Sequence, residues 1–273
     1  MIITAKLMGG VGNQMFQIAA AKGLTMKLKE LYPEEYKNVR CVFDFNKCDT
    51  QLQGNVSNTY KDDFFRLIPN ETINKLKYNF KENGFSYSEI PPVKEWVKGL
   101  ELFGYFQSPK YFHDYRDDIL NTFYFSEERI EKIYDFLNSV GGGEDDRVTA
   151  VHVRRGDYLN NPGYHPTCGI EYYQKAMEII GDSKFVFISD DIEWCKENFK
   201  GENIYYSPFT SELDDLTLIS NCDNQIIANS SFSWWGAYLC KLEDNIVIGP
   251  RTWFGPKGPQ DTHDILLDDW IKI

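Results

Sequence analysis

The sequence lacks any run of about 18 apolar residues, the length that a membrane-spanning helix needs. Its first residues, MIITAKLMGGVGNQMF, also lack the basic start and the long apolar core of a secretory signal peptide. These two absences predict a cytoplasmic protein without a membrane span. Peripheral contact with a membrane stays open, and so does the oligomeric state.

Basic residues are scarce relative to acidic ones: 29 Lys and Arg stand against 41 Asp and Glu, for a net charge of −12. This charge opposes binding to nucleic acid and to anionic lipid, so we expect neither as a partner. A doubly charged anionic substrate would need a local cluster of positive groups. Adjacent arginines are therefore worth locating.

Patterns typical of disulfide frameworks and zinc sites are also missing. The cysteines show no CxxC spacing, and they are Cys41, Cys48, Cys168, Cys195, Cys222 and Cys240. The histidines pair with none of them, and they are His113, His152, His165 and His263. We expect reduced, mostly buried cysteines and no zinc site. A manganese site at Asp191 and Glu193 remains an alternative to a metal-free site.

The 273 residues suffice for one large domain or two compact ones. In the first half we predict strands over 2–8, 39–45 and 99–105, a helix from Asn13 as N-cap to about 31, and a helix over 126–139. The stretch 46–98 has no clear period. The glycine-rich and acidic run 141–146 is the predicted linker.

The second half alternates regularly between strands and helices. Strands are predicted over 148–154, 184–189, 203–206, 224–229 and 245–249, and helices over 170–180, 191–199, 211–221 and 232–241. This order indicates a parallel sheet covered by helices on both faces, with ligands at the carboxyl ends of its strands. We therefore predict two α/β nucleotide-fold domains, 1–140 and 147–273, facing across a cleft.

The segment VHVRRGDY ends one of these strands and places Arg154 and Arg155 at the ligand edge. Guanidinium groups are permanently charged and fork toward phosphate oxygens. Adjacent side chains on a strand diverge, so either Arg154 or Arg155 faces the cleft. A surface arginine pair bonded to carboxylates is the alternative. His152 points either to the cleft or into the sheet, and Asp157 is a candidate base or an orienting group for Arg154.

The segment NSSFSWWG lies between a strand and a helix, where free backbone N–H groups attract anions. Ser230 and Ser231 add hydroxyl donors, and Phe232 serves as wall or core; a plain helix start with packed aromatics is the alternative. Asp190 and Asp191 follow another strand. They accept from a guanine edge or a ribose, or they cap the next helix.

A glycine loop follows the first strand and resembles a phosphate-approaching turn. It lacks both the full dinucleotide pattern and the P-loop lysine, so a simple tight turn is an equal alternative. Its candidate residues are Gly10, Val11, Gly12 and Asn13.

Taken together, GGVGNQMFQ, VHVRRGDY, ISDDIEWC and NSSFSWWGAYL resemble the α-1,2-fucosyltransferase family (glycosyltransferase family 11) in order and placement. The resemblance spans residue 9 to about residue 240. It implies a GT-B-like fold, GDP-fucose as donor, inversion to an α-linkage, and neither cofactor nor essential metal. It further implies an acceptor that is a galactose-terminated oligosaccharide or glycolipid, with the N-terminal domain on the acceptor side. Vertebrate members carry a membrane anchor, so a bacterial cytoplasmic form is implied here.

The same resemblance implies individual roles. Arg154 would hold the donor phosphates, His152 would contact the nucleotide, and Asp190 or Asp191 would lie near guanine. The pyrophosphate turn corresponds to Ser230, Ser231 and Phe232, and the donor-facing GxGN loop corresponds to Gly12 and Asn13. Two alternatives remain: another GT-B enzyme with a different nucleotide sugar, and a carbohydrate-binding module whose aromatic residues serve only stacking.

Overall fold

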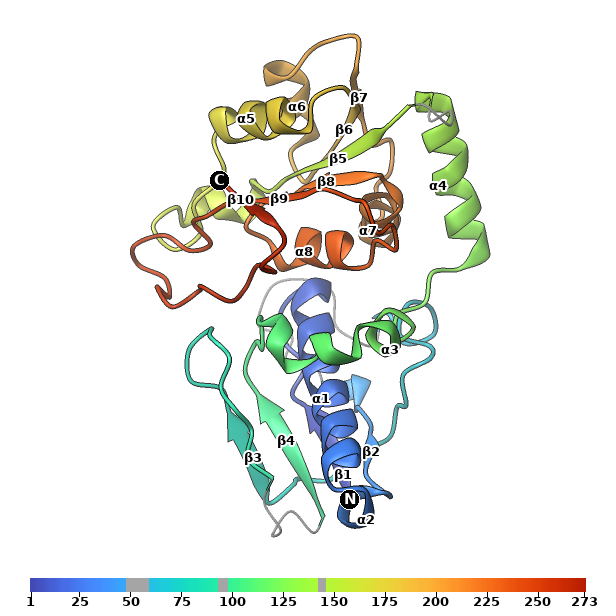
Figure 1. Cartoon of the computed structure of the whole chain (residues 1–273), viewed down its shortest axis with the longest axis vertical. Helices are drawn as coiled ribbons and strands as arrows, with labels where there is room; N and C mark the ends of the chain where they lie inside the picture. The colour runs from blue at the N-terminus through green and yellow to red at the C-terminus, as the bar shows by residue number, and fades with distance from the viewer. Residues whose placement is uncertain (48–58, 93–97, 142–145) are drawn as a thin grey trace. The chain divides into compact units, whose positions relative to one another are not determined.

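The protein, seen here as a computed structural model, is described over residues 1–47, 59–92, 98–141 and 146–273. The chain divides into two compact units (Figure 1). Unit 1 is Met1–Tyr124 with His263–Ile265, and unit 2 is Phe125–Thr262 with Leu266–Ile273. Within the described ranges, no helix combines the length and the apolar character needed to cross a bilayer. Residues 142–145 of the predicted linker lie outside the described residues.

Unit 1 contains a four-stranded parallel sheet in the order β2-β1-β4-β3. Its strands are β1 (Ile2–Ala5), β2 (Arg40–Cys41), β3 (Tyr78–Lys81) and β4 (Gly99–Phe103). The strand predicted over 39–45 is wrong beyond Cys41, because the chain turns into a 3₁₀ segment at Phe45–Lys47. β3 was not predicted. None of its four side chains is fully buried, so it gives no continuous apolar run.

Most residues of helix α1 (Val11–Leu31) are buried, and they are spread around the helix rather than along one narrow apolar stripe. The helix packs against β1 and against the two 3₁₀ turns Pro109–Tyr111 and His113–Tyr115. Gly23 allows the closest approach, because a Cβ there would lie 2.4 Å from the carbonyl oxygen of Tyr111. Two short helices complete the unit: α2 (Pro33–Tyr36) and α3 (Arg116–Leu120).

Unit 2 contains a six-stranded parallel sheet in the order β10-β9-β8-β5-β6-β7. The strands are β5 (Val148–Val153), β6 (Lys184–Ser189), β7 (Ile204–Tyr206), β8 (Asn224–Ile226), β9 (Val247–Gly249) and β10 (Ile271–Lys272). The chain proceeds outward from β5 in one direction and then from β8 in the other, which is the Rossmann order. Its topological switch point therefore lies between β5 and β8. The predicted α/β class with two parallel-sheet units is confirmed.

Helices cover both faces of this sheet (Figure 1). They are α4 (Glu127–Val140), α5 (Ile170–Ile180), α6 (Ile192–Asn198), α7 (Glu212–Asn221) and α8 (Ser231–Tyr238). One buried cluster joins Val148 and Ala150 of β5 to residues of α4 and α7. The other joins Val151 and Val153 to residues of α5 and α6. Because side chains alternate along a strand, β5 separates an α4/α7/α8 face from an α5/α6 face.

Helix α4 belongs to unit 2, although we predicted that residues up to 140 form the first domain. Its buried residues Ile133, Leu137 and Val140 join the core between α4, α7 and β5. Asp214 of α7 also pairs with Arg129 at 3.0 Å and with Lys132. Apolar burial against α7 therefore makes α4 part of unit 2.

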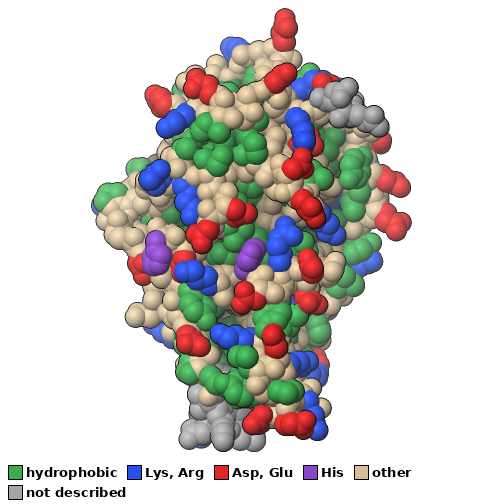
Figure 2. All heavy atoms as spheres, in the orientation of Figure 1, with side chains coloured by type: hydrophobic (Ala, Val, Ile, Leu, Met, Phe, Trp, Pro, Cys, Tyr) green, Lys and Arg blue, Asp and Glu red, His purple; other side chains and the backbone are tan. Residues whose placement is uncertain are grey.

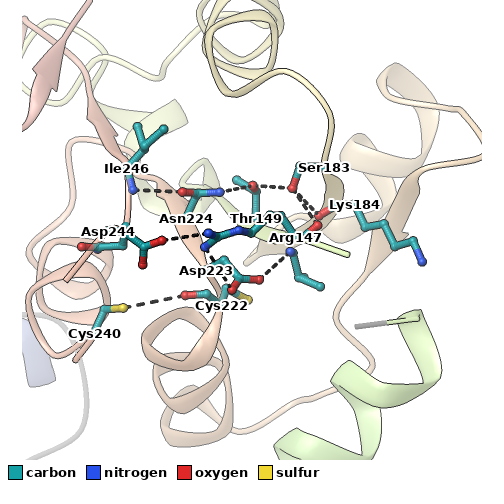
Figure 3. A network of polar contacts seen from close by, with 12 residues as sticks. Arg147, Thr149, Ser183, Lys184, Cys222, Asp223, Asn224, Cys240, Asp244 and Ile246 are labelled. Atoms are coloured by element: carbon teal, nitrogen blue, oxygen red, sulfur yellow. Dashed lines mark hydrogen bonds and ion pairs between the residues drawn. The ribbon is translucent and has the colours of Figure 1, made fainter. Parts of the chain in front are cut away.

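The amino ends of the unit 2 strands are tied together by polar contacts (Figure 3). The hydroxyls of Thr149 and Ser183 lie 2.7 Å apart, which joins β5 to the start of β6. Asn224 donates to Thr149 at 3.4 Å and accepts from the backbone N–H of Ile246 at 2.9 Å. Arg147 pairs with Asp244 at 2.8 Å. These contacts fix strand register at the edge opposite the candidate site.

Candidate functional site

The arginines that follow β5 diverge, as the strand geometry predicts. Arg155 turns to the α5/α6 face, where its Nε donates to Asp191 at 2.9 Å and its guanidinium lies 4.0 Å from the ring centre of Trp194. Alternate residues of a strand share a face of the sheet. Arg154 therefore lies at the carboxyl end of β5, on the face of Ala150 and His152, which α7 and α8 cover.

Two carboxylates hold the Arg154 guanidinium. Nη2 pairs with Asp157, and Nη1 pairs with Asp190 at 2.8 Å. The ring of Tyr158 lies beneath it, with 5.4 Å between guanidinium and ring centre. About a third of the Arg154 side chain, 32%, remains exposed. A guanidinium has five N–H donors, so two ion pairs leave further donors for a ligand.

Tyr158 joins the two strand ends at the switch point. Its hydroxyl, buried with the rest of the residue, donates to the backbone carbonyl of Asn229 at 3.0 Å. The Asn229 side chain in turn donates to the carbonyls of Pro166 and Trp253, both at 2.9 Å. Burial raises the pKa of Tyr158, so the hydroxyl stays protonated and remains a donor. The VHVRRGDY and NSSFSWWG segments therefore form one connected structure.

Helix α8 begins next to this connection, with Ser230 as its N-cap and Ser231 as its first residue. The Ser230 side chain makes no capping hydrogen bond, while its carbonyl accepts from Trp234 N–H at 3.0 Å. The first N–H groups of a helix have no intrahelical acceptor, and the helix dipole makes its start positive. This start of α8 is consequently suited to an anion.

His152 lies within β5 and is only 5% exposed. Its ring packs against Phe232 of α8, with 5.4 Å between ring centres. Its Nδ1 is buried without a hydrogen-bond partner among the residues the structure describes. Burial, with a smaller contribution from the charge of Arg154, lowers the pKa of His152 to about 3. His152 is therefore neutral at pH 7 and points into the sheet–α8 layer.

Asp190 and Asp191 have separate tasks. Asp190 accepts from the Arg155 backbone N–H at 2.9 Å in addition to its pairing with Arg154. Asp191 caps α6 by accepting from the Trp194 N–H at 3.3 Å, as one of the two interpretations of the sequence predicts. In the described ranges, no three His, Cys, Asp or Glu side chains form a potential metal cluster.

In unit 1 the glycine loop also stands at the carboxyl edge of its sheet. Gly9 has a φ of +77°, a conformation that favours glycine, and Gly10 is the N-cap of α1. The predicted N-cap Asn13 is wrong, because Asn13 lies inside the first turn of α1. Its Oδ1 instead accepts from Gln107 Nε2 at 2.7 Å. Val11 and Gly12 are buried, so the loop offers mainly its backbone and the half-buried Asn13.

Sequence reasoning missed several residues that shape these loops. Gln17 bonds both backbone groups of Met8, and Gln14 donates to the carbonyl of Gly9 at 2.8 Å. In unit 2, His165 stacks on Tyr158 with 4.6 Å between ring centres, and burial lowers its pKa. Gln14 and Gln17 lie inside the GGVGNQMFQ segment but were given no role there, and His165 lies outside the quoted motifs, so only the folded chain reveals these contacts.

The cysteines behave as expected over the part of the chain that is described. Cys195, Cys222 and Cys240 are buried and free, and Cys41 and Cys168 are free and partly buried. Burial raises the pKa of the Cys41 thiol to about 12 and of the Cys195 thiol to about 11, so both remain protonated. Cys48 lies outside the described residues.

A Rossmann-type sheet with an arginine and a helix start at its carboxyl edge is an arrangement suited to a nucleotide or another phosphorylated ligand. The sequence matches the family model described as Glycosyl transferase family 11 over residues 3–273. The chain therefore belongs to glycosyltransferase family 11, and the predicted family is confirmed.

Curated relatives agree with this assignment. The O-antigen biosynthesis glycosyltransferase WbnK of Escherichia coli is 33% identical, over 98% of this chain and 99% of that protein. An α-1,2-colitosyltransferase of the same organism is 28% identical, over 100% and 99% respectively. Galactoside α-(1,2)-fucosyltransferase 2 of Rattus norvegicus is 30% identical, over 50% and 42%. Among solved structures, the fucosyltransferase NodZ from Bradyrhizobium covers 86% of this chain and 90% of its own, with 12% identity and a TM-score of 0.47.

Proposed function

We propose that this protein transfers L-fucose from GDP-fucose to the 2-hydroxyl of a terminal galactose, with inversion to an α-1,2 linkage. The observation that carries the proposal is the placement of Arg154 at the carboxyl end of β5, over the ring of Tyr158, whose hydroxyl bonds the turn before α8. Family membership and the names of the relatives supply the sugar and the linkage.

Fucosyl transfer leaves negative charge on the β-phosphate of GDP as the bond to the sugar breaks. Arg154 is held by Asp157 and Asp190, so its guanidinium is oriented before the substrate binds. The N–H groups near Ser231 supply further fixed donors. Donors fixed in this way stabilise charge that develops in the transition state more than they stabilise the ground state. In this mechanism Arg154 neutralises the leaving group.

Asp157 orients Arg154 in this mechanism. One of its oxygens pairs with Arg154. The other, Oδ2, is buried and has no hydrogen-bond partner in the described part of the chain. A buried oxygen is poorly placed to take a proton from an acceptor sugar, although small movements on substrate binding can expose it. We therefore assign Asp157 the role of orienting Arg154, and removal of the acceptor proton is the alternative role of this carboxylate.

The nucleotide half of the donor fits unit 2 in this proposal. His152 is neutral and buried behind Phe232, so the two support the Ser230–Ser231 turn. Arg155, Asp190 and Asp191 form the neighbouring strand end, where a carboxylate could meet guanine. Unit 1, with Gly10, Val11, Gly12 and Asn13 at its sheet edge, would serve the acceptor side. We expect no cofactor, no essential metal, a galactose-terminated oligosaccharide or glycolipid acceptor, and action in the cytoplasm.

A second donor has a specific observation in its favour. The relative named as an α-1,2-colitosyltransferase aligns over the whole chain. Colitose differs from L-fucose by the missing 3-hydroxyl, so the same phosphate chemistry would serve either sugar. GDP-colitose is therefore the alternative donor.

Nucleotide release tests the proposal. We would incubate the protein with a terminal galactoside and with GDP-fucose, GDP-colitose, GDP-mannose or UDP-galactose, and measure the free nucleoside diphosphate. GDP-fucose should give the highest kcat/KM. Faster turnover of GDP-colitose would replace the donor, turnover of UDP-galactose alone would refute the GDP assignment, and binding without turnover would favour a carbohydrate-binding protein.

A further inference from the structure

Glu82 holds the end of a neighbouring strand in unit 1. It directly follows β3, and its Oε2 accepts from the backbone N–H groups of Tyr105 and Phe106, both at 2.8 Å. Phe106 has a φ of +53° and is the one non-glycine residue with positive φ in the described chain. Strained backbone of this kind persists only where its surroundings hold it, and it is common at functional sites. The two bonds from Glu82 supply that hold.

The turn after β4 is shaped for this carboxyl. A Cβ at Gly104 would lie 2.4 Å from the Cβ of Glu82, so only glycine allows the approach. The residue after Phe106 is Gln107, whose Nε2 donates to Asn13 of the glycine loop at 2.7 Å. Glu82 is consequently connected, through one short turn, to the loop at the carboxyl end of β1.

Unpaired polar atoms mark the same place. Glu82 is 8% exposed and Asp264 is 7% exposed. Asp264 Oδ1 is buried without a hydrogen-bond partner among the described residues, and so is Glu82 Oε1, while the Tyr111 hydroxyl interacts with the Glu82 carboxyl. A buried orphan oxygen is costly, and it indicates a partner such as a proton, a water or a ligand hydroxyl.

Two of the residues that bond these carboxyls through their backbone N–H groups, Tyr105 and Tyr87, are aromatic. Phe85 and Tyr105 are stacked, with ring centres 5.7 Å apart and an angle of 20° between planes. Both residues are half-buried. Tyr87 donates its backbone N–H to Asp264 at 3.0 Å, and its ring lies 4.9 Å from that of Tyr111. Flat rings next to carboxylate and hydroxyl groups suit a sugar, which has one apolar face and an edge of hydroxyls.

We propose that the carboxyl edge of the unit 1 sheet is the acceptor subsite, with the Phe85–Tyr105 pair under the apolar face of a galactoside and Glu82 as the residue that positions Tyr105. This inference rests on the proposed function, because it assumes a galactoside acceptor. Glu82 is a positioning residue, since it acts through the backbone of Tyr105 and Phe106.

Protonation of Glu82 gives the proposal a second readout. Burial, with a smaller effect of Asp264, raises the pKa of Glu82 to about 7. The charged and titratable groups around it are Asp264, Tyr111, Lys110 (3.4 Å from Asp264) and, beyond Ser86, His263. As pH rises through 7, Glu82 ionises, and its carboxylate then accepts the Tyr105 and Phe106 N–H bonds more strongly. The KM for the acceptor should therefore fall between pH 6.5 and 8.5.

The experiment measures acceptor KM and kcat at saturating GDP-fucose for Phe85→Ala, Glu82→Ala and Glu82→Gln, together with GDP binding by calorimetry. Glu89→Gln is the matched control, because Glu89 is an exposed acid of the same unit, 3.8 Å from Lys27. We expect Phe85→Ala to raise acceptor KM about 10-fold, as for the loss of one stacked ring, with GDP affinity unchanged. Glu82→Gln keeps an oxygen for the two N–H groups but cannot ionise. Its acceptor KM should stay near the wild-type value at pH 6.5 and remain flat up to pH 8.5.

The failures are distinguishable. If the wild-type protein transfers nothing from GDP-fucose to galactosides, the proposed function fails. If it transfers fucose but folded Phe85→Ala keeps the wild-type acceptor KM, the subsite is refuted alone. A Glu82→Gln profile that follows the wild-type pH dependence would refute the role of Glu82. Loss of folding in Glu82→Ala would leave the Phe85→Ala and Glu82→Gln results to decide.

Discussion

Replacing Arg154 tests the transition-state role that the geometry of the strand end supports. Alanine removes the charge and the fork, while lysine keeps a charge but cannot reproduce a bidentate contact. One lost transition-state donor typically costs about 10²–10³ in kcat, so we expect Arg154→Ala to lower kcat by about 10²-fold or more. Arg154→Lys should recover part of that loss.

The folded state should survive these changes. The Arg154, Asp157 and Asp190 side chains are 32%, 28% and 27% exposed, and ion pairs at such exposure contribute up to about 1 kcal/mol each. Arg147→Ala is the matched control, because Arg147 also pairs with carboxylates but lies at the amino edge of the same sheet. It should keep wild-type kcat. Melting by circular dichroism checks folding in each variant.

Removing Arg154 also leaves Asp157 and Asp190 without their shared cation. Their charges should then repel the donor diphosphate, so the Kd for GDP should rise in Arg154→Ala. Adding Asp190→Asn removes one of these charges and should restore part of the GDP affinity without restoring kcat. Near wild-type kcat in a folded Arg154→Ala protein would remove Arg154 from the mechanism and turn attention to Arg155.

The remaining predictions concern the Tyr158 hydroxyl, the buried His152 and the metal dependence of GDP binding. Tyr158→Phe should lower the free energy of unfolding by about 1 kcal/mol, because it leaves the Asn229 carbonyl without its donor. Urea titration would measure this, and an unchanged midpoint would contradict a stabilising Tyr158–Asn229 hydrogen bond. His152 has a folded pKa of about 3 against 6.5 unfolded, so its contribution to stability is full above pH 6.5 and is lost as pH falls toward 3. His152→Gln should therefore show a weaker loss of stability than wild type between pH 7 and pH 4, and parallel curves would refute this. GDP should bind with the same Kd in EDTA and in magnesium by calorimetry, because arginine and backbone N–H supply the charge; binding that needs magnesium would overturn the metal-free site.

The sequence predicts unit 2 well because its elements have clear periods. β5 is buried along its whole length, β6 contains the apolar run 185–188, and α5 has an apolar stripe, so local pattern and tertiary burial agree. Unit 1 is harder. β3 has no fully buried side chain, and β2 is only two residues long, so neither carries a strong strand signal.

The residues of the candidate site were likewise predicted only in part from the sequence. Motifs located Arg154, Asp157 and Ser230, and strand alternation correctly separated Arg154 from Arg155. Local pattern could not show that Asp190 braces Arg154, because the two residues meet only across paired strands. Glu82 had no sequence signal at all, since its place depends on a strained turn that follows another strand.

The most direct test of the central claim is linkage analysis of the product made from GDP-fucose and a galactose-terminated oligosaccharide. Our account predicts one added fucose, joined through an α-linkage to the 2-hydroxyl of the terminal galactose, by mass spectrometry of methylated product and by NMR. A different sugar, a different position on galactose, or a β-linkage would contradict it.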